Sequence, residues 1–103
     1  IFILEWIMKD KVFEYIRGIP RGKVVTYGMI AEYLGNKRLS RVVGNILHSN
    51  EDGDMYPCYK VVNAKGKLSN NYKFGGIDEQ KKRLECDGID VNDYHVDLEK
   101  YKM

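Results

Sequence analysis

The sequence contains few of the residues on which disulfide-rich, metal-binding or membrane proteins depend. It has two cysteines and two histidines, with no Cys-x-x-Cys pair and no histidine pair at ligand spacing, which argues against a disulfide framework and a zinc site. It also lacks a glycine-rich phosphate loop. Residues 1–4 are apolar, but Glu5 ends the run, well short of the roughly 18 residues that a membrane helix needs. We therefore expect no metal, no cofactor, no membrane attachment and a reducing, cytoplasmic setting, nucleoid-associated if the organism is prokaryotic.

The remaining composition, 44% hydrophobic and 31% charged, is typical of a globular chain. A length of 103 residues predicts a single domain, with a core at about 8–90 and a polar, partly ordered tail at 91–103. Charge is uneven, since residues 17–73 carry ten Lys or Arg against four Asp or Glu and residues 78–103 carry five against eight. This asymmetry fits either a polyanion-binding face or a solvated surface of uneven charge.

Local patterns predict a mainly helical chain. The sequence leaves open whether residues 1–7 are native, and the first helix is expected to begin at Asp10 as its N-cap and to end near Arg17. Thr26 is a second N-cap, after a short β-type link at 23–25. The apolar stripe expected in the helix after Thr26 consists of Ile30, Tyr33 and Leu34.

Two short helices separated by a tight Gly-Asn turn at 35–36 predict a helix-turn-helix. The second is expected from about Ser40 to His48, and Arg41, Asn45 and His48 share its outer face at i, i+4 and i+7. A cation, an amide and an imidazole on a face without acidic residues suit a helix that lies in a nucleic-acid groove. An ordinary amphipathic helix with a polar outer face is the alternative. Its predicted buried stripe is Val43, Ile46 and Leu47.

A small β wing is expected to follow this pair of helices. Residues 59–62 favour a strand, residues 63–66 favour a turn, and residues 67–68 are expected to return as a second strand. A last helix is expected from about Ile77 to Asp87. The fold class predicted from these patterns is a mainly α winged helix-turn-helix with a small β wing.

Cys58 lies in the most constrained segment of the chain. Pro57 restricts the backbone before it and the valines after Lys60 favour a strand, so the thiol is held in one direction. Lys60 follows two residues later, and a cation near a thiol favours the nucleophilic thiolate. The alternative is a buried structural cysteine, since free cysteines are among the most buried residues.

Three segments resemble the DNA-binding domain of the alkylguanine-DNA alkyltransferases (methylated-DNA–protein-cysteine methyltransferases). They are IPRGKVVTYG at 19–28, GN at 35–36 followed by SRVVG at 40–44, and PCYKVV at 57–62. The resemblance spans about residues 10–90 and is to this domain standing alone, as in the short alkyltransferase-like proteins, which lack a working cysteine. It implies a winged helix-turn-helix that enters the minor groove of duplex DNA and flips a damaged guanine into a pocket beside the cysteine.

The resemblance also implies a role for each matching residue. Cys58 matches the alkyl acceptor, Asn50 the hinge between recognition helix and active-site loop, and Asp87 the glutamate of the family's proton relay. Tyr27 matches the tyrosine that crowds the target phosphate, and Arg41 matches the arginine finger that fills the vacated stack. The remaining assignments are DNA contacts at Ser40, Asn45 and Lys60, and a base pocket at Pro57, Leu68, Ser69 and Tyr72.

Two positions depart from the family pattern. The family's cysteine is followed by a histidine that, with the glutamate and a water, deprotonates the thiol. Here Tyr59 follows, and a phenol with a pKa of about 10 is a poor base at neutral pH, so activation would depend on Lys60 and backbone dipoles. Asn45 replaces a small residue that lets the helix sit deep in the groove, although its amide can donate to a base edge.

Three functions are compatible with the sequence. The first is irreversible transfer of an alkyl group from guanine O6 to Cys58 by a monomer that binds alkylated duplex DNA. The second is lesion binding without transfer, with nucleotide-excision repair proteins as partners. Tyr59 favours the second, whereas the retained Cys58 favours the first. The third is a winged-helix transcription regulator, for which the sequence supplies no dimerisation helix.

Overall fold

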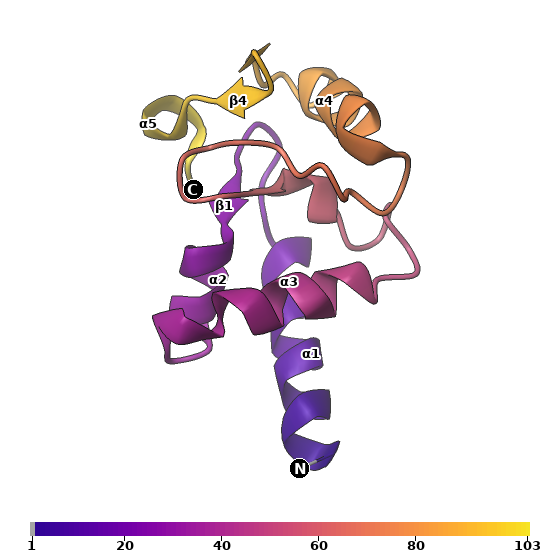
Figure 1. Cartoon of the computed structure of the whole chain (residues 1–103), viewed down its shortest axis with the longest axis vertical. Helices are drawn as coiled ribbons and strands as arrows, with labels where there is room; N and C mark the ends of the chain where they lie inside the picture. Colours follow the sequence, from indigo (N-terminus) through magenta and orange to yellow (C-terminus); the bar gives the residue numbers. More distant parts are fainter. Residues whose placement is uncertain (1) are drawn as a thin grey trace.

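Short helices surround two small β ladders in this chain (Figure 1). The computed structural model describes the backbone of residues 2–103 and the side chains from Trp6 onward. The helices are α1 (Phe2–Arg17), α2 (Tyr27–Tyr33), α3 (Ser40–His48), α4 (Gly76–Cys86) and α5 (Leu98–Tyr101), with 3-10 turns η1 (Lys37–Leu39) and η2 (Cys58–Lys60). The strands are β1 (Val25–Thr26), β2 (Val61–Val62), β3 (Val91–Asn92) and β4 (His95–Val96). Among the described residues, no helix has both the length and the apolar character needed to cross a bilayer.

Helices α2 and α3 form the predicted helix-turn-helix. Thr26 caps α2, because its hydroxyl oxygen accepts from the Met29 amide over 3.1 Å. The turn begins at Gly35, whose φ of 105° suits glycine, and it contains η1, which the sequence did not indicate. Tyr33 is 54% exposed, so its predicted burial is wrong. Ala31 takes its place in the core beside Ile30, while Val43, Ile46 and Leu47 are buried as predicted.

The two-residue ladder between β1 and β2 separates two hydrophobic clusters. The strands are parallel, with Val25 opposite Val61 and Thr26 opposite Val62. Successive side chains of a strand point to opposite faces, so Val25 and Val61 pack with α1, α2 and α3, whereas Val24 and Val62 pack on the other side with α4 and the C-terminal residues. Figure 1 shows this division, with α1, α2 and α3 below β1 and with α4, β4 and α5 above it.

The wing differs in detail from the prediction. The expected strand at 59–62 is reduced to β2, because residues 58–60 form a 3-10 turn. The turn at 63–66 exists, and the Asn63 amide donates to the Lys67 carbonyl over 3.0 Å. However, Lys67 bridges to His95 and the Leu68 amide donates to the Tyr94 carbonyl. The return segment therefore pairs with the β3–β4 hairpin, and the winged-helix class itself is confirmed.

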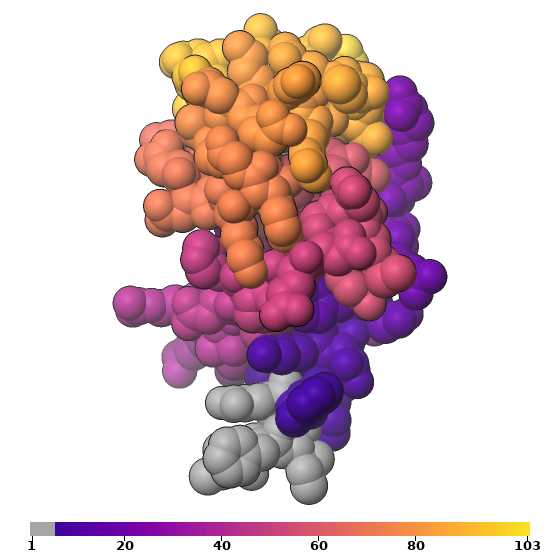
Figure 2. All heavy atoms as spheres, turned by 90° about the vertical axis from the view of Figure 1, so that its right-hand side faces the viewer, coloured from indigo at the N-terminus to yellow at the C-terminus, as the bar shows by residue number. Residues whose placement is uncertain are grey.

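Residues 91–103 are ordered, which corrects the expected partly ordered tail. They form β3, β4 and α5 and lie at the top of the molecule in Figure 2. The Tyr101 carbonyl accepts from the Val24 amide and the Val24 carbonyl accepts from the Met103 amide, both over 2.9 Å. At the other end of the chain α1 begins at Phe2, so Asp10 lies inside this helix and does not cap it.

The C-terminal residues should contribute directly to stability. Tyr101 is buried in the hydrophobic cluster that contains Val24, Val62 and Leu84, which we call the upper cluster; the other is the lower cluster. The Tyr101 hydroxyl oxygen accepts from the Asp90 amide over 3.1 Å. We expect Tyr101→Ala to lower the free energy of unfolding by about 3 kcal/mol and Tyr101→Phe, which removes only the hydrogen bond, by about 1 kcal/mol. Urea denaturation measures both, with exposed Glu99→Ala as control. Equal effects of Tyr101→Ala and the control would contradict the packing of this segment.

Candidate active site

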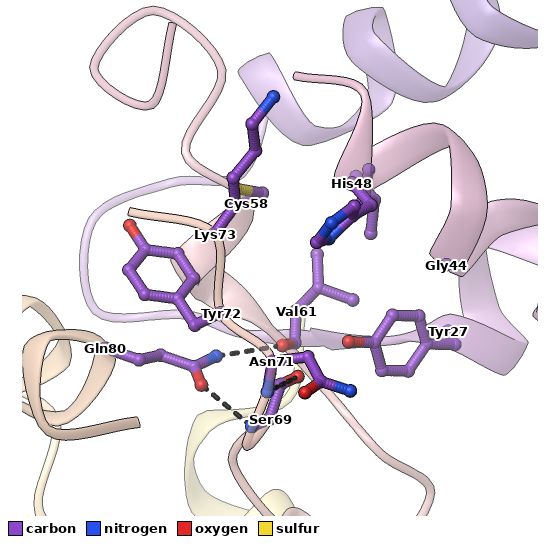
Figure 3. Close-up of a pocket in the computed structure, with 11 residues that line it drawn as sticks. Tyr27, Gly44, His48, Cys58, Val61, Ser69, Asn71, Tyr72, Lys73 and Gln80 are labelled. Carbon is purple, nitrogen blue, oxygen red and sulfur yellow. Dashed lines mark hydrogen bonds between the residues drawn. The ribbon is translucent and has the colours of Figure 1, made fainter. Parts of the chain in front are cut away.

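Cys58 lies in a cavity of about 70 Å³ between the helix-turn-helix and α4 (Figure 3). We call this cavity the thiol pocket. Its walls come from α2, α3, the loop at 69–73 and α4. The residues that line it are Tyr27, Gly44, Leu47, His48, Cys58, Val61, Ser69, Asn71, Tyr72, Lys73 and Gln80.

The thiol of Cys58 is fixed in direction and largely desolvated. Pro57 precedes η2, and the Cys58 amide donates to the Tyr56 carbonyl over 2.7 Å. The residue is 8% exposed. Burial raises the pKa of the thiol, while the hydrogen bond from Asn50 and the positive charges of Arg83 and Lys73 oppose this rise. At neutral pH the sulfur is therefore mostly protonated.

Asn50 connects the end of α3 to the thiol. Its side-chain nitrogen donates to the Tyr56 carbonyl over 2.8 Å and to Cys58 Sγ over 3.4 Å. Its side-chain oxygen accepts from the Asp52 amide over 3.0 Å, and its backbone oxygen accepts from Lys73 Nζ over 2.6 Å. The side chain is buried with both of its polar ends satisfied, so it can hold the loop and the sulfur at fixed positions relative to α3.

Tyr72 carries an unsatisfied hydroxyl in the pocket. It is 8% exposed, and among the described side chains its hydroxyl is buried without a hydrogen-bond partner. Burial raises the pKa of Tyr72 to about 12, with the nearby Cys58 contributing, so the phenol keeps its proton. A buried donor without a partner is costly, and a ligand acceptor in the pocket would remove that cost.

Gln80 holds the pocket walls together, although it is not among the site residues predicted from the sequence. Its amide nitrogen donates to the Tyr59 carbonyl over 3.0 Å. It also donates to the Val61 carbonyl over 3.2 Å, and its oxygen accepts from the Ser69 amide over 2.8 Å (Figure 3). Its position three residues after Ile77 and four before Leu84, both apolar, was the available signal. Lys73, His48 and Asn71 are further pocket residues that were not singled out as such.

The exposed face of α3 borders an open groove of about 600 Å³, which we call the recognition groove. Arg41, Asn45 and His48 all line it and all are exposed, as expected from their spacing. Ser40 lines it too, but its hydroxyl donates to the Lys37 carbonyl over 2.9 Å. The groove and the thiol pocket share five lining residues, so the two cavities adjoin. The shared residues are Tyr27, Gly44, His48, Ser69 and Asn71.

Lys60 is buried and lines neither the recognition groove nor the thiol pocket. It is 6% exposed, its ammonium lies 3.4 Å from an Asp87 carboxylate oxygen, and it donates to the carbonyls of Ile19 and Pro20. The prediction that Lys60 contacts DNA or activates Cys58 is therefore wrong. Residues two apart share a face only on a strand, and residues 58–60 form a 3-10 turn.

Tyr59 and Asp87 line a different cavity from the one that contains the thiol. This second cavity, of about 340 Å³, also borders Arg21 and Arg83. Burial raises the pKa of Tyr59, and the negative charge of Asp87 adds to that rise. Asp87 accepts from the Gly22 amide over 2.8 Å. The structure thus places Tyr59 and Asp87 together but does not bring either residue into the wall of the thiol pocket.

The four predicted base-pocket residues have different positions. Ser69 and Tyr72 line the thiol pocket. Leu68 belongs to the upper hydrophobic cluster, so its assignment to the pocket is wrong. Pro57 contributes by shaping the backbone before Cys58 and is not part of the lining. Among the described residues, no three His, Cys, Asp or Glu side chains come together as metal ligands.

Comparison with known proteins agrees with this geometry. The model of the family "6-O-methylguanine DNA methyltransferase, DNA binding domain" matches residues 8–89. A DNA base-flipping protein of Vibrio parahaemolyticus is 40% identical over 93 residues, which cover 89% of this chain and 91% of that protein. A bifunctional methyltransferase/endonuclease of Picrophilus torridus is 40% identical over 91 residues, but this chain spans only 30% of its length.

A solved structure gives the same result. The crystal structure of S. pombe Atl1 in complex with damaged DNA containing O6-carboxymethylguanine matches with a TM-score of 0.85 and 31% identity over 94% of each chain. A winged helix-turn-helix with a cysteine pocket behind its recognition helix is the class that fold and site define. The chain belongs to the family of 6-O-methylguanine DNA methyltransferase DNA-binding domains.

The buried Lys60–Asp87 pair should be important for stability. We expect Lys60→Met to lower the free energy of unfolding by about 3 kcal/mol, because it removes the buried cation of Asp87 and leaves only the exposed Arg21, at 3.8 Å, to pair with that carboxylate. Lys65→Met, at an exposed lysine in the turn at 63–66, is the control and should change stability by less than about 0.5 kcal/mol. Urea denaturation of both variants tests this, and equal stabilities would show that the pair contributes nothing.

Proposed function

We propose that this protein binds duplex DNA, receives an O6-alkylguanine base in the thiol pocket and accepts its alkyl group on Cys58. The observation that carries the proposal is the position of the thiol, which lies in a cavity that adjoins the recognition groove beside α3 and shares five lining residues with it. A base extruded from DNA bound along α3 would therefore enter next to the sulfur. The printed functions of the relatives, base flipping and cysteine methyl transfer, support the same assignment.

The exposed face of α3 has the chemistry that a DNA contact requires. Arg41, Asn45 and His48 present hydrogen-bond donors, and α3 contains no acidic residue that would repel phosphates. By the family pattern, α3 lies in the minor groove and Arg41 fills the gap that the extruded base leaves. Tyr27, at the start of α2 and in both cavities, would meet the backbone phosphate of that nucleotide.

The thiol pocket must open to admit a base. Its volume of about 70 Å³ is far below the roughly 300 Å³ at which small-molecule sites begin. Helices α2 and α3 contribute several residues each to the core, whereas the loop at 69–73 is anchored there by Tyr72 and is otherwise held by hydrogen bonds such as those of Gln80 and Lys73. This loop is therefore the wall that we expect to move. Once the base is inside, the free Tyr72 hydroxyl can donate to it.

The proposed reaction is a single in-line displacement without a cofactor. The Cys58 thiol loses its proton to solvent, and the thiolate sulfur attacks the alkyl carbon. The S–C bond forms as the C–O6 bond breaks, and the electron pair of that bond remains on guanine, which takes up one proton. The net change converts thiol and O6-alkylguanine into thioether and guanine, so each molecule acts once.

Lesion binding without transfer is a second candidate. It is favoured by the burial that raises the pKa of Cys58 and by Tyr59, which lies outside the thiol pocket and supplies no base. In that case the protein would mark alkylguanine for other repair factors. The two functions share the pocket and the flipped base and differ only in what happens at the sulfur.

Transfer can be measured by mass spectrometry. We expect one methyl group on the Cys58 peptide, and none on the exposed Cys86, after incubation with duplex DNA containing O6-methylguanine. Because the thiol pKa is raised, the rate should increase about tenfold per pH unit from pH 6 to 8. Cys58→Ala should show no adduct. Absence of an adduct in the wild type at every pH from 6 to 9, with lesion binding intact, would leave the second function.

Tyr72→Phe tests the base pocket through its unsatisfied hydroxyl. Removal of a buried donor without a partner should leave stability unchanged or raise it by about 1 kcal/mol. The same change should weaken binding of the methylated duplex about fivefold, since a hydrogen bond to the base worth about 1 kcal/mol is lost. Urea denaturation and fluorescence anisotropy measure the two effects. Unchanged affinity would show that Tyr72 does not donate to the base.

A further inference from the structure

Lys73 is a charged residue of the thiol pocket that none of the expected roles includes. Its ammonium donates to the Asn50 carbonyl over 2.6 Å, and Asn50 in turn donates from its side chain to Cys58 Sγ over 3.4 Å. Lys73 and Cys58 line the same cavity (Figure 3). Asn50 therefore contacts both the ammonium of Lys73 and the sulfur of Cys58.

Among the described side chains, no carboxylate pairs with Lys73. Six ion pairs occur among the described side chains, and none of them involves Lys73. Lys60, by contrast, is paired with Asp87, and Arg83 lies within 3.7 Å of both Asp54 and Glu79. The charge of Arg83 lowers the pKa of Cys58 more than that of Lys73 does, but of the two only Lys73 lines the thiol pocket and has no carboxylate partner among the described side chains.

Groups that can carry charge approach the thiol from every element around it. Tyr27 and Tyr72 stay neutral because burial raises the pKa of each phenol. Arg83 and Lys73 are the two cations that lower the pKa of Cys58, against the larger effect of burial. The groups are Tyr27 on α2, His48 on α3, Tyr72 and Lys73 on the loop, and Arg83 on α4.

We propose that Lys73 is a positioning residue for Cys58: its ammonium, held on the Asn50 carbonyl, adds positive charge inside the pocket wall that favours the thiolate. This inference rests on the proposed alkyl transfer, for which the thiolate is the nucleophile. Lys73 acts through Asn50 and through its field, and it takes no proton from the sulfur. Lys73 thereby replaces part of the thiol activation that Tyr59 and Lys60 do not supply. Tyr59 offers no base, and the charge of Lys60 is paired with Asp87.

The Lys73–Asn50 contact could instead serve only to hold the loop closed, and three substitutions separate these roles. Lys73→Arg keeps the charge and the donor, Lys73→Gln keeps a neutral donor, and Lys73→Met removes both. Lys65→Met removes the same charge from an exposed turn that lines no part of the pocket, so it is the matched control.

The experiment measures the pKa of the Cys58 thiol directly, without DNA. The folded protein is treated with iodoacetamide between pH 6 and 11, and labelling of the Cys58 peptide is followed by mass spectrometry. The pH midpoint is the readout, because a looser loop changes access to the sulfur at all pH values alike. The same variants are then incubated with methylated duplex, and circular dichroism confirms that each is folded.

We expect Lys73→Met and Lys73→Gln to raise the midpoint by about 0.5 to 1 pH unit, which lowers labelling and methyl transfer at pH 7 about three- to tenfold. Lys73→Arg and Lys65→Met should match the wild type. An unchanged midpoint in Lys73→Met, or a wild-type midpoint in Lys73→Gln, would overturn the inference. If the midpoint shifts as expected but the wild type takes up no methyl group, the proposed transfer fails while the effect of Lys73 on the thiol stands.

Discussion

The parallel pairing of β1 with β2 is the contact on which the rest of the structure depends. It joins two valines to a Val-Thr pair 36 residues earlier in the chain, and all of α2, η1 and α3 lie between them. Because Thr26 caps α2 and η2 runs directly into β2, this pairing brings Tyr27 and Cys58 to the same cavity. The position of the thiol relative to the recognition helix therefore follows from the register of two very short strands.

The same ladder divides the interior and so separates two tasks. The lower cluster supports the helix-turn-helix and includes Cys58, whereas the upper cluster holds α4 and the C-terminal residues. Gln80 crosses between them with three hydrogen bonds. Around it the thiol pocket retains features that cost stability, namely a desolvated thiol and the free hydroxyl of Tyr72. Such features are expected where a protein keeps groups available for a ligand rather than for itself.

Local signals in the sequence predicted much of the fold and part of the site. Thr26 as a cap, the stripe of Val43, Ile46 and Leu47, and the outward face with Arg41 and Asn45 all depend on neighbours within a few residues, and the structure agrees with each. The errors concern long-range contacts. The position of Lys60 depends on Asp87, which is 27 residues away, and the order of residues 91–103 depends on Val24. Neither partner could be identified from spacing along the chain.

A crystal structure of the Cys58→Ala variant with a duplex that contains O6-methylguanine would test the account most directly. The account predicts that the modified guanine lies in the thiol pocket, with its methyl group facing residue 58, the Tyr72 hydroxyl donating to the base and Arg41 in the vacated stack. A structure in which α3 contacts the DNA while the modified guanine remains stacked in the duplex and the loop at 69–73 stays closed would contradict it.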